Sequence, residues 1–132
     1  MTTTGYSGTP LWKKLGLKPG LKLWTHNAPP HYSQLTDGPN NWVKVARPAQ
    51  ANALHIFITT IAELSQISDC AQHMPPAIML WVSWPKKTSP LSRGLGEDDI
   101  RKAALSCGLV DIKVCAVDAD WSGLKLTRRA KF

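Results

Sequence analysis

The sequence predicts an α/β fold: a three-layer, Rossmann-like arrangement with a mostly parallel sheet that ends in an antiparallel hairpin. Two observations support this class. Apolar runs of strand length alternate with helical repeats through the middle of the chain, which favours parallel strands joined by helices. Near the end, two alternating runs flank the short polar segment 118–123, a pattern typical of an antiparallel hairpin.

In the first half of the chain we expect one short helix and three strands. Thr9 and Pro10 are typical of a helix start, and Gly16 of a helix end. The segment 31–41 contains turn residues and one short helical possibility, so it cannot be placed. Strands rich in apolar residues are expected over 21–25, 42–45 and 53–59.

In the second half, helices and strands alternate. Ile61, Leu64 and Ile67 recur at helical spacing and predict an amphipathic helix over 60–73. Three acids at 97–99 favour the first turn of a second helix, over 97–107. The remaining strands are expected over 77–82, 109–117 and 124–129, with a polar, aromatic and basic turn over 83–87.

Length and composition set the class of protein. A single domain over 1–132 is expected, because 43% hydrophobic residues and six tryptophans suffice for a core. Since no apolar stretch approaches twenty residues and the start lacks the pattern of a signal peptide, we expect neither a membrane span nor secretion. The three cysteines show no close pairing and no metal spacing with the histidines, which fits a cytoplasmic protein without a metal.

The carboxyl edge of the predicted sheet collects residues that could bind a ligand. Open α/β sheets bind their ligands just beyond the carboxyl ends of the strands. At this edge two tryptophans could stack a base or sugar, and two lysines could hold a phosphate. The candidate ligand-binding residues are Tyr6, Ser7, Asn27, Ser83, Trp84, Lys86, Lys87, Asp118, Trp121 and Ser122.

Several of these residues also have a purely structural interpretation. Trp84 and Trp121 could pack over the end of the sheet and cap it. Lys86 and Lys87 could form a solvated turn, and Asp118 could hydrogen-bond within its own turn. The sequence leaves both interpretations open.

The charge of the chain indicates its class of partner. A net charge of +7 favours partners that carry phosphate, such as nucleotides or nucleic acid, through steering and counterion release. The basic end of the chain could contact nucleic acid, or could protect an edge strand against aggregation. Its cations are Lys125, Arg128, Arg129 and Lys131.

Five longer motifs stand out, at 5–11 (GYSGTPL), 13–20 (KKLG and KPG), 81–86 (WVSWPK), 108–118 (GLVD and KVCAVD) and 121–125 (WSGLK). They resemble the bacterial family known as domain of unknown function 3052 (DUF3052). The order of elements also resembles a shortened class I methyltransferase-like Rossmann sheet, with a leading helix and a Lys-Pro-Gly turn before the first strand. The resemblance implies a bacterial protein of this fold and no assigned reaction.

The chain departs from the methyltransferase pattern after the first strand. Glycines there let the backbone approach the cofactor, whereas this loop contains Pro29 and Pro30, which lack N–H donors and fix φ. The second strand runs into Arg47 without the acid that would bind a ribose. We therefore expect no methyl donor bound in the usual way, no other cofactor and no catalytic residue.

These observations favour a non-catalytic binding domain for a nucleotide-like or nucleic-acid group at the carboxyl edge. Two alternatives stay open. One is a divergent methyltransferase-like transferase with a non-standard cofactor loop. The other is a protein-interaction module whose exposed tryptophans mark a partner surface.

Overall fold

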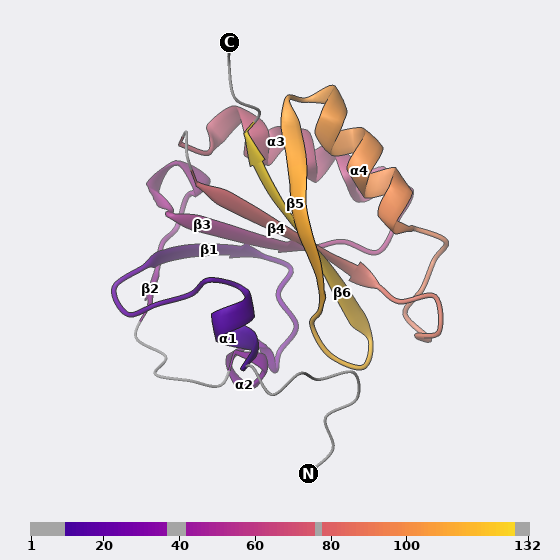
Figure 1. Cartoon of the computed structure of the whole chain (residues 1–132), viewed down its shortest axis with the longest axis horizontal. Coiled ribbons are helices and arrows are strands. Elements are labelled where there is room, and N and C mark those ends of the chain that lie inside the picture. Colours follow the sequence, from indigo (N-terminus) through magenta and orange to yellow (C-terminus); the bar gives the residue numbers. More distant parts are fainter. Residues whose placement is uncertain (1–9, 37–41, 76–77, 129–132) are drawn as a thin grey trace.

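The computed structural model describes residues 10–36, 42–75 and 78–128. Within them lies one six-stranded sheet of order β2-β1-β3-β4-β6-β5 (Figure 1). The first four strands are parallel, and β6 pairs antiparallel with both β4 and β5. This arrangement confirms the predicted fold class. The strands are β1 (Lys22–His26), β2 (Val43–Lys44), β3 (Ala53–Phe57), β4 (Met79–Pro85), β5 (Leu109–Ala116) and β6 (Trp121–Arg128).

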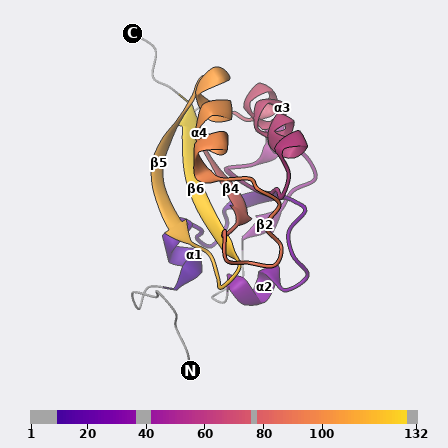
Figure 2. The same cartoon turned by 90° about the vertical axis from the view of Figure 1, so that its right-hand side faces the viewer.

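Helices cover the two faces of the sheet unequally. The longer helices α3 and α4 lie on one face, and the single turn α1 lies on the other (Figure 2). Among the residues that the structure describes, no helix therefore covers much of the second face over β5 and β6. The helical segments are α1 (Leu11–Lys14), α2 (Tyr32–Leu35), η1 (Pro48–Gln50), η2 (Ile61–Leu64), α3 (Ser65–His73) and α4 (Glu97–Ser106).

Each face of the sheet has its own apolar core. The larger core packs alternate residues of β3, β4 and β6 against α3 and α4, as with Ile56, Val82 and Leu124. The smaller core packs the strand residues that point to the other face, such as Phe57 and Trp81, against α1. There the indole nitrogen of Trp81 donates a hydrogen bond to the carbonyl of Leu15 at 2.9 Å, which fixes the end of α1 to β4. Both faces of β3 are buried, as is typical of parallel strands.

The predicted turn over 83–87 is wrong in its first half. Strand β4 continues to Pro85, because Ser83, Trp84 and Pro85 pair with Gly123, Ser122 and Trp121 of β6. Strand β6 accordingly begins three residues before the predicted start, at Trp121 rather than Leu124. Pro85 is tolerated here because the pairing of β4 with β3 has already ended at Ser83. Beyond that residue, no backbone N–H of β4 is needed on the side of β3.

The helix predicted over 60–73 begins as a 3₁₀ turn. The Glu63 carboxylate accepts hydrogen bonds from the backbone N–H groups of Thr59 and Thr60, at 2.9 and 3.0 Å, and thereby caps that turn. Because a 3₁₀ turn interrupts the helical spacing, Ile61 is 53% exposed instead of facing the core. The buried face of α3 consists of Ile67, Cys70 and Ala71.

The other predicted elements agree with the structure to within two residues at either end. The unplaced segment contains α2, and the helix-capping role expected for Thr9 lies outside the described residues. In the described part of the chain, no helix has the length and hydropathy needed to span a membrane.

We expect the substitution Gly123→Ala to destabilise the fold. A Cβ at this position would lie 3.2 Å from Cγ2 of Val117 and 3.3 Å from Cε3 of Trp81, closer than ordinary van der Waals contact, and both of these side chains are buried. Overpacking of this kind costs about 1–3 kcal/mol, which urea unfolding would measure. As a control, Gly96→Ala adds the same methyl group at the N-cap of α4, 3.9 Å from Oδ2 of Asp99, and should cost about 1 kcal/mol or less, from the preference for glycine over alanine at that position. Equal losses in the two variants would contradict this packing.

Candidate functional site

The loop after β1 turns sharply at the carboxyl edge of the sheet. Asn27 has a φ of 57°, in the left-handed region that asparagine tolerates better than most residues, and its side chain is exposed. The carbonyl of Pro29 accepts a hydrogen bond from the backbone N–H of Tyr32 at 2.9 Å, where α2 begins. The loop therefore brings the side chain of Tyr32 back over the end of the sheet.

A buried hydrogen-bond network lies beneath this loop. The hydroxyl of Tyr32 is 3.0 Å from Nδ1 of His55, and Nε2 of His55 is 2.7 Å from the hydroxyl of Ser83. Burial lowers the pKa of His55 to about 3, so the ring is neutral at pH 7. A neutral imidazole has one donor and one acceptor nitrogen, and both are satisfied here. The network thus links the first loop to the ends of β3 and β4.

Aromatic rings fill the remaining space around this network. Phe57 stacks on His55 with ring centroids 4.4 Å apart, and contacts Tyr32 edge-on at 5.8 Å. Trp121 packs edge-on against the other side of Phe57 at 5.0 Å. The interior at the carboxyl edge is consequently packed with side chains.

Three of the predicted ligand-binding residues belong to this interior or to the core. Ser83 is fully buried on His55, while Trp84 and Trp121 are only 6% and 8% exposed. The extension of β4 places Trp84 in the core beneath α3 and α4. The predicted stacking of a ligand on Trp84 and Trp121 is therefore wrong, and these two indoles are not exposed as the protein-interaction alternative expected. Both indoles cap the end of the sheet, which was the structural alternative.

Other predicted residues do lie at the surface of this edge. Lys87 is exposed, and Lys86 and Ser122 are partly exposed. The backbone N–H of Lys86 donates to the carbonyl of Asp120 at 2.7 Å, and the hydroxyl of Ser89 donates to the Asp120 carboxylate at 2.9 Å. These two bonds hold the lysine-bearing turn rigidly against the β5–β6 hairpin.

Asp118 performs the structural role that the sequence left open. Its Oδ1 accepts hydrogen bonds from the backbone N–H groups of Asp120 and Trp121, both at 2.8 Å. Its Oδ2 lies 3.3 Å from Nε2 of His31, a residue that sequence reasoning did not select. The carboxylate thereby joins the first loop to the hairpin, 87 residues away in sequence. Candidates Tyr6 and Ser7 lie outside the described residues.

The residues of this edge do not fit an S-adenosyl cofactor bound in the manner usual for the fold. That manner requires a glycine loop whose backbone approaches the ligand. Here the loop contains two prolines, Ala28 packs against the smaller core, and Tyr32 occupies the space beneath. Across residues 10–36, 42–75 and 78–128, no group of three or more metal-ligating side chains occurs.

Comparison with known proteins identifies the fold and no family. No family model matches the chain, and no curated protein is significantly similar to it. Many solved structures share the fold. Three of these structures are compared below: two methyltransferases and a cyclase, which are 7–14% identical to this chain.

The magnesium protoporphyrin IX methyltransferase of Synechocystis with bound SAM is 14% identical, with a TM-score of 0.59 over 90% of this chain and 74% of that one. The mitomycin 7-O-methyltransferase MmcR is 8% identical, with a TM-score of 0.59 over 92% and 53%. The cyclase SpnF is 7% identical, with a TM-score of 0.60 over 92% and 79%. The chain therefore has a methyltransferase-like Rossmann fold, and identities this low assign no activity.

The buried imidazole should make stability depend on pH. Below about pH 6.5 the unfolded chain binds a proton at His55 that the folded chain does not bind until about pH 3. The free energy of unfolding should therefore fall by about 1.4 kcal/mol per pH unit across this interval, on account of this one group. Urea unfolding of wild type and His55→Gln between pH 4 and 7.5 measures the difference in slope. His73→Gln, at an exposed helix end, is the control; parallel slopes for wild type and His55→Gln would contradict the assignment.

Proposed function

We propose that the chain is a non-catalytic domain of the methyltransferase-like fold, and that it binds a nucleotide-like or nucleic-acid group at the carboxyl edge of its sheet. In this proposal it is a cytoplasmic bacterial protein of the DUF3052 family. The first part rests on the packed interior at that edge. A methyl donor in the usual position would have to displace Tyr32 and break its hydrogen bond to His55.

The surface that remains at this edge suits a phosphate. Lys86 and Lys87 supply ammonium groups, which bind phosphate as point charges. Among the described residues, no ion pair neutralises either lysine. Asn27 and Ser122 add neutral polar side chains at the ends of two other strands.

The proposal rests on one observation: Tyr32 occupies the place beneath the first loop, whereas the turn that bears Lys86 and Lys87 at the same edge is accessible. The turn is braced to the hairpin by Asp120, and the hairpin is joined to the first loop by Asp118. Preorganised loops of this kind lose little conformational entropy when a ligand binds. The arrangement favours binding over methyl transfer.

A thermal-shift panel tests the proposal directly. The purified protein is heated with S-adenosylmethionine, S-adenosylhomocysteine, mono- and dinucleotides, and short single-stranded RNA. A ligand at about a hundred times its Kd should stabilise the fold by about 2.7 kcal/mol. We expect stabilisation by a nucleotide or RNA, and its loss in the double variant Lys86→Gln and Lys87→Gln.

The matched control removes two exposed lysines elsewhere, in Lys44→Gln with Lys102→Gln, and should keep the shift. Stabilisation by an S-adenosyl compound would overturn the non-catalytic assignment and favour a divergent transferase. The absence of any shift across the panel would overturn nucleotide binding at this edge.

A further inference from the structure

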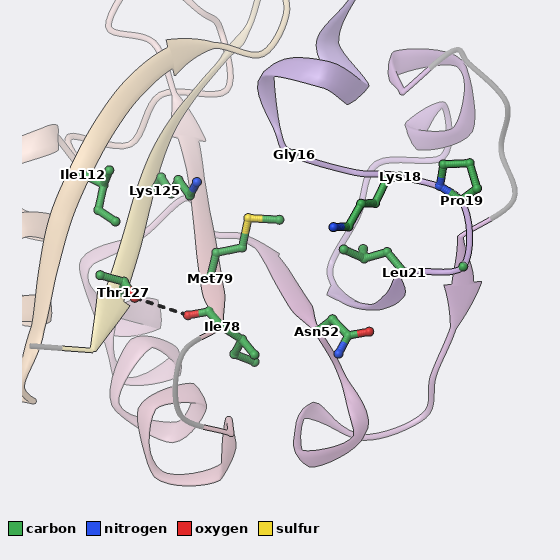
Figure 3. A pocket seen from close by; sticks show the side chains of 11 residues that line it. Gly16, Lys18, Pro19, Leu21, Asn52, Ile78, Met79, Ile112, Lys125 and Thr127 are labelled. Atoms are coloured by element: carbon green, nitrogen blue, oxygen red, sulfur yellow. Dashed lines mark hydrogen bonds between the residues drawn. The ribbon is translucent and has the colours of Figure 1, made fainter. Parts of the chain in front are cut away.

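A concave surface lies at the edge of the sheet opposite to the carboxyl edge. It is an open groove of about 650 Å³ at the amino ends of the parallel strands (Figure 3). One wall is the loop 16–21 between α1 and β1, and the other is formed by β5 and β6. Figure 3 shows Lys18 and Lys125 pointing into the groove from opposite sides of Met79. Its volume is in the range typical of ligand sites.

A β-bulge shapes the wall on β5. Asp111 pairs with Leu126 and Lys113 pairs with Lys125, so Ile112 is an extra residue between two registered pairs. Ile112 lines the groove and is 53% exposed. The bulge therefore adds an exposed apolar side chain to a wall that also carries lysines.

Lys125 of this wall has a second lysine directly opposite it on β5, next to the groove. Lys113 and Lys125 are cross-strand partners, and partners in an antiparallel pair project from the same face. Like charges in this arrangement destabilise a sheet. An anion bound beside the two lysines would relieve this repulsion.

The acidic residue of β5 projects away from this wall. Asp111, the acid on β5, is 3.2 Å from Nε of Arg101 on α4, and so projects from the helix-covered face. The lining of the groove includes no acid. None of the ion pairs within the described ranges involves Lys18, Lys113 or Lys125. Within residues 10–36, 42–75 and 78–128, the groove is consequently a basic surface whose lysines form no ion pair.

We propose that this basic groove, formed by Lys18 and Lys125 around the apolar side chains of Met79 and Ile112 and extended on β5 by Lys113 beside Lys125, binds single-stranded nucleic acid. The lysines contact successive phosphates, and a base lies against the apolar side chains. The pairing of cations with an apolar surface is the reason for this choice, since single strands are bound by charge together with base packing. An acidic peptide would use the charges alone. The site lies at the opposite edge from the one in the proposed function and does not depend on it.

Fluorescence anisotropy with a labelled mixed-sequence dodecamer, as RNA and as DNA, tests the groove at 50 to 200 mM salt. In Lys113→Gln with Lys125→Gln we expect about tenfold weaker binding, and a salt slope smaller by about 1.4 for two lost phosphate contacts. This variant should fold, because it removes a like-charge pair. Lys44→Gln with Lys102→Gln makes the same change in net charge outside the groove and should bind nearly as wild type.

A second comparison tests the contact with a base. An abasic strand of the same length should bind about tenfold more weakly than the base-containing strand. Ile112→Ser should weaken binding of the base-containing strand and leave the abasic strand unaffected. If the abasic strand, inorganic polyphosphate or poly-glutamate binds as tightly as the dodecamer, the assignment to nucleic acid is overturned.

Two further results would overturn the location of the site. Equal losses in the groove variant and in the control variant would indicate non-specific attraction by net charge. A loss confined to Lys86→Gln with Lys87→Gln would place nucleic acid at the carboxyl edge, supporting the proposed function and overturning the groove. Loss confined to the groove variant would support this inference whatever the thermal-shift panel finds.

Discussion

The pairing of β6 with β4 is the interaction on which the rest of the structure depends. It runs through registered pairs from Leu80 with Leu126 to Pro85 with Trp121, and places the last strand inside the sheet. Without it, the β5–β6 hairpin would not be paired to the four parallel strands. The pairing requires Gly123, because Trp81 and Val117 occupy the space where a side chain would project. It also determines which residues of β6 reach each edge of the sheet.

At the carboxyl edge this pairing closes the interior. It carries Trp121 onto Phe57, next to the network of Tyr32, His55 and Ser83, and the hairpin then holds the neighbouring loops through its aspartates. The fold is similar to that of a methyltransferase with bound SAM, but in this chain aromatic and hydrogen-bonded side chains occupy the interior at the carboxyl edge. A ligand in the proposed function would therefore contact surface residues of this edge, among them Lys86 and Lys87.

The two faces of the sheet also differ in the charged side chains that they carry. On the helix-covered face, Arg101 of α4 forms ion pairs with Glu97, Asp98 and Asp111. The face that lacks long helices carries Lys125 and its partner Lys113. Because the acids on one face cannot screen the lysines on the other at close range, a basic groove persists. Arg128, predicted among the basic residues of the chain end, donates instead to carbonyls of Ala71 and Met74 and caps α3.

The sequence by itself determined the fold class, most strand and helix positions and the absence of a glycine loop, since periodicity, caps and turn residues are local properties. Only the tertiary structure decided which side chains are accessible. Trp84 looked like part of a turn because strand length depends on the partner strand, and pairing with Ser122 extended β4 past it. Lys113 and Lys125 became a candidate site only through their cross-strand register and a one-residue bulge. Register and bulges depend on contacts between distant segments, which local patterns do not specify.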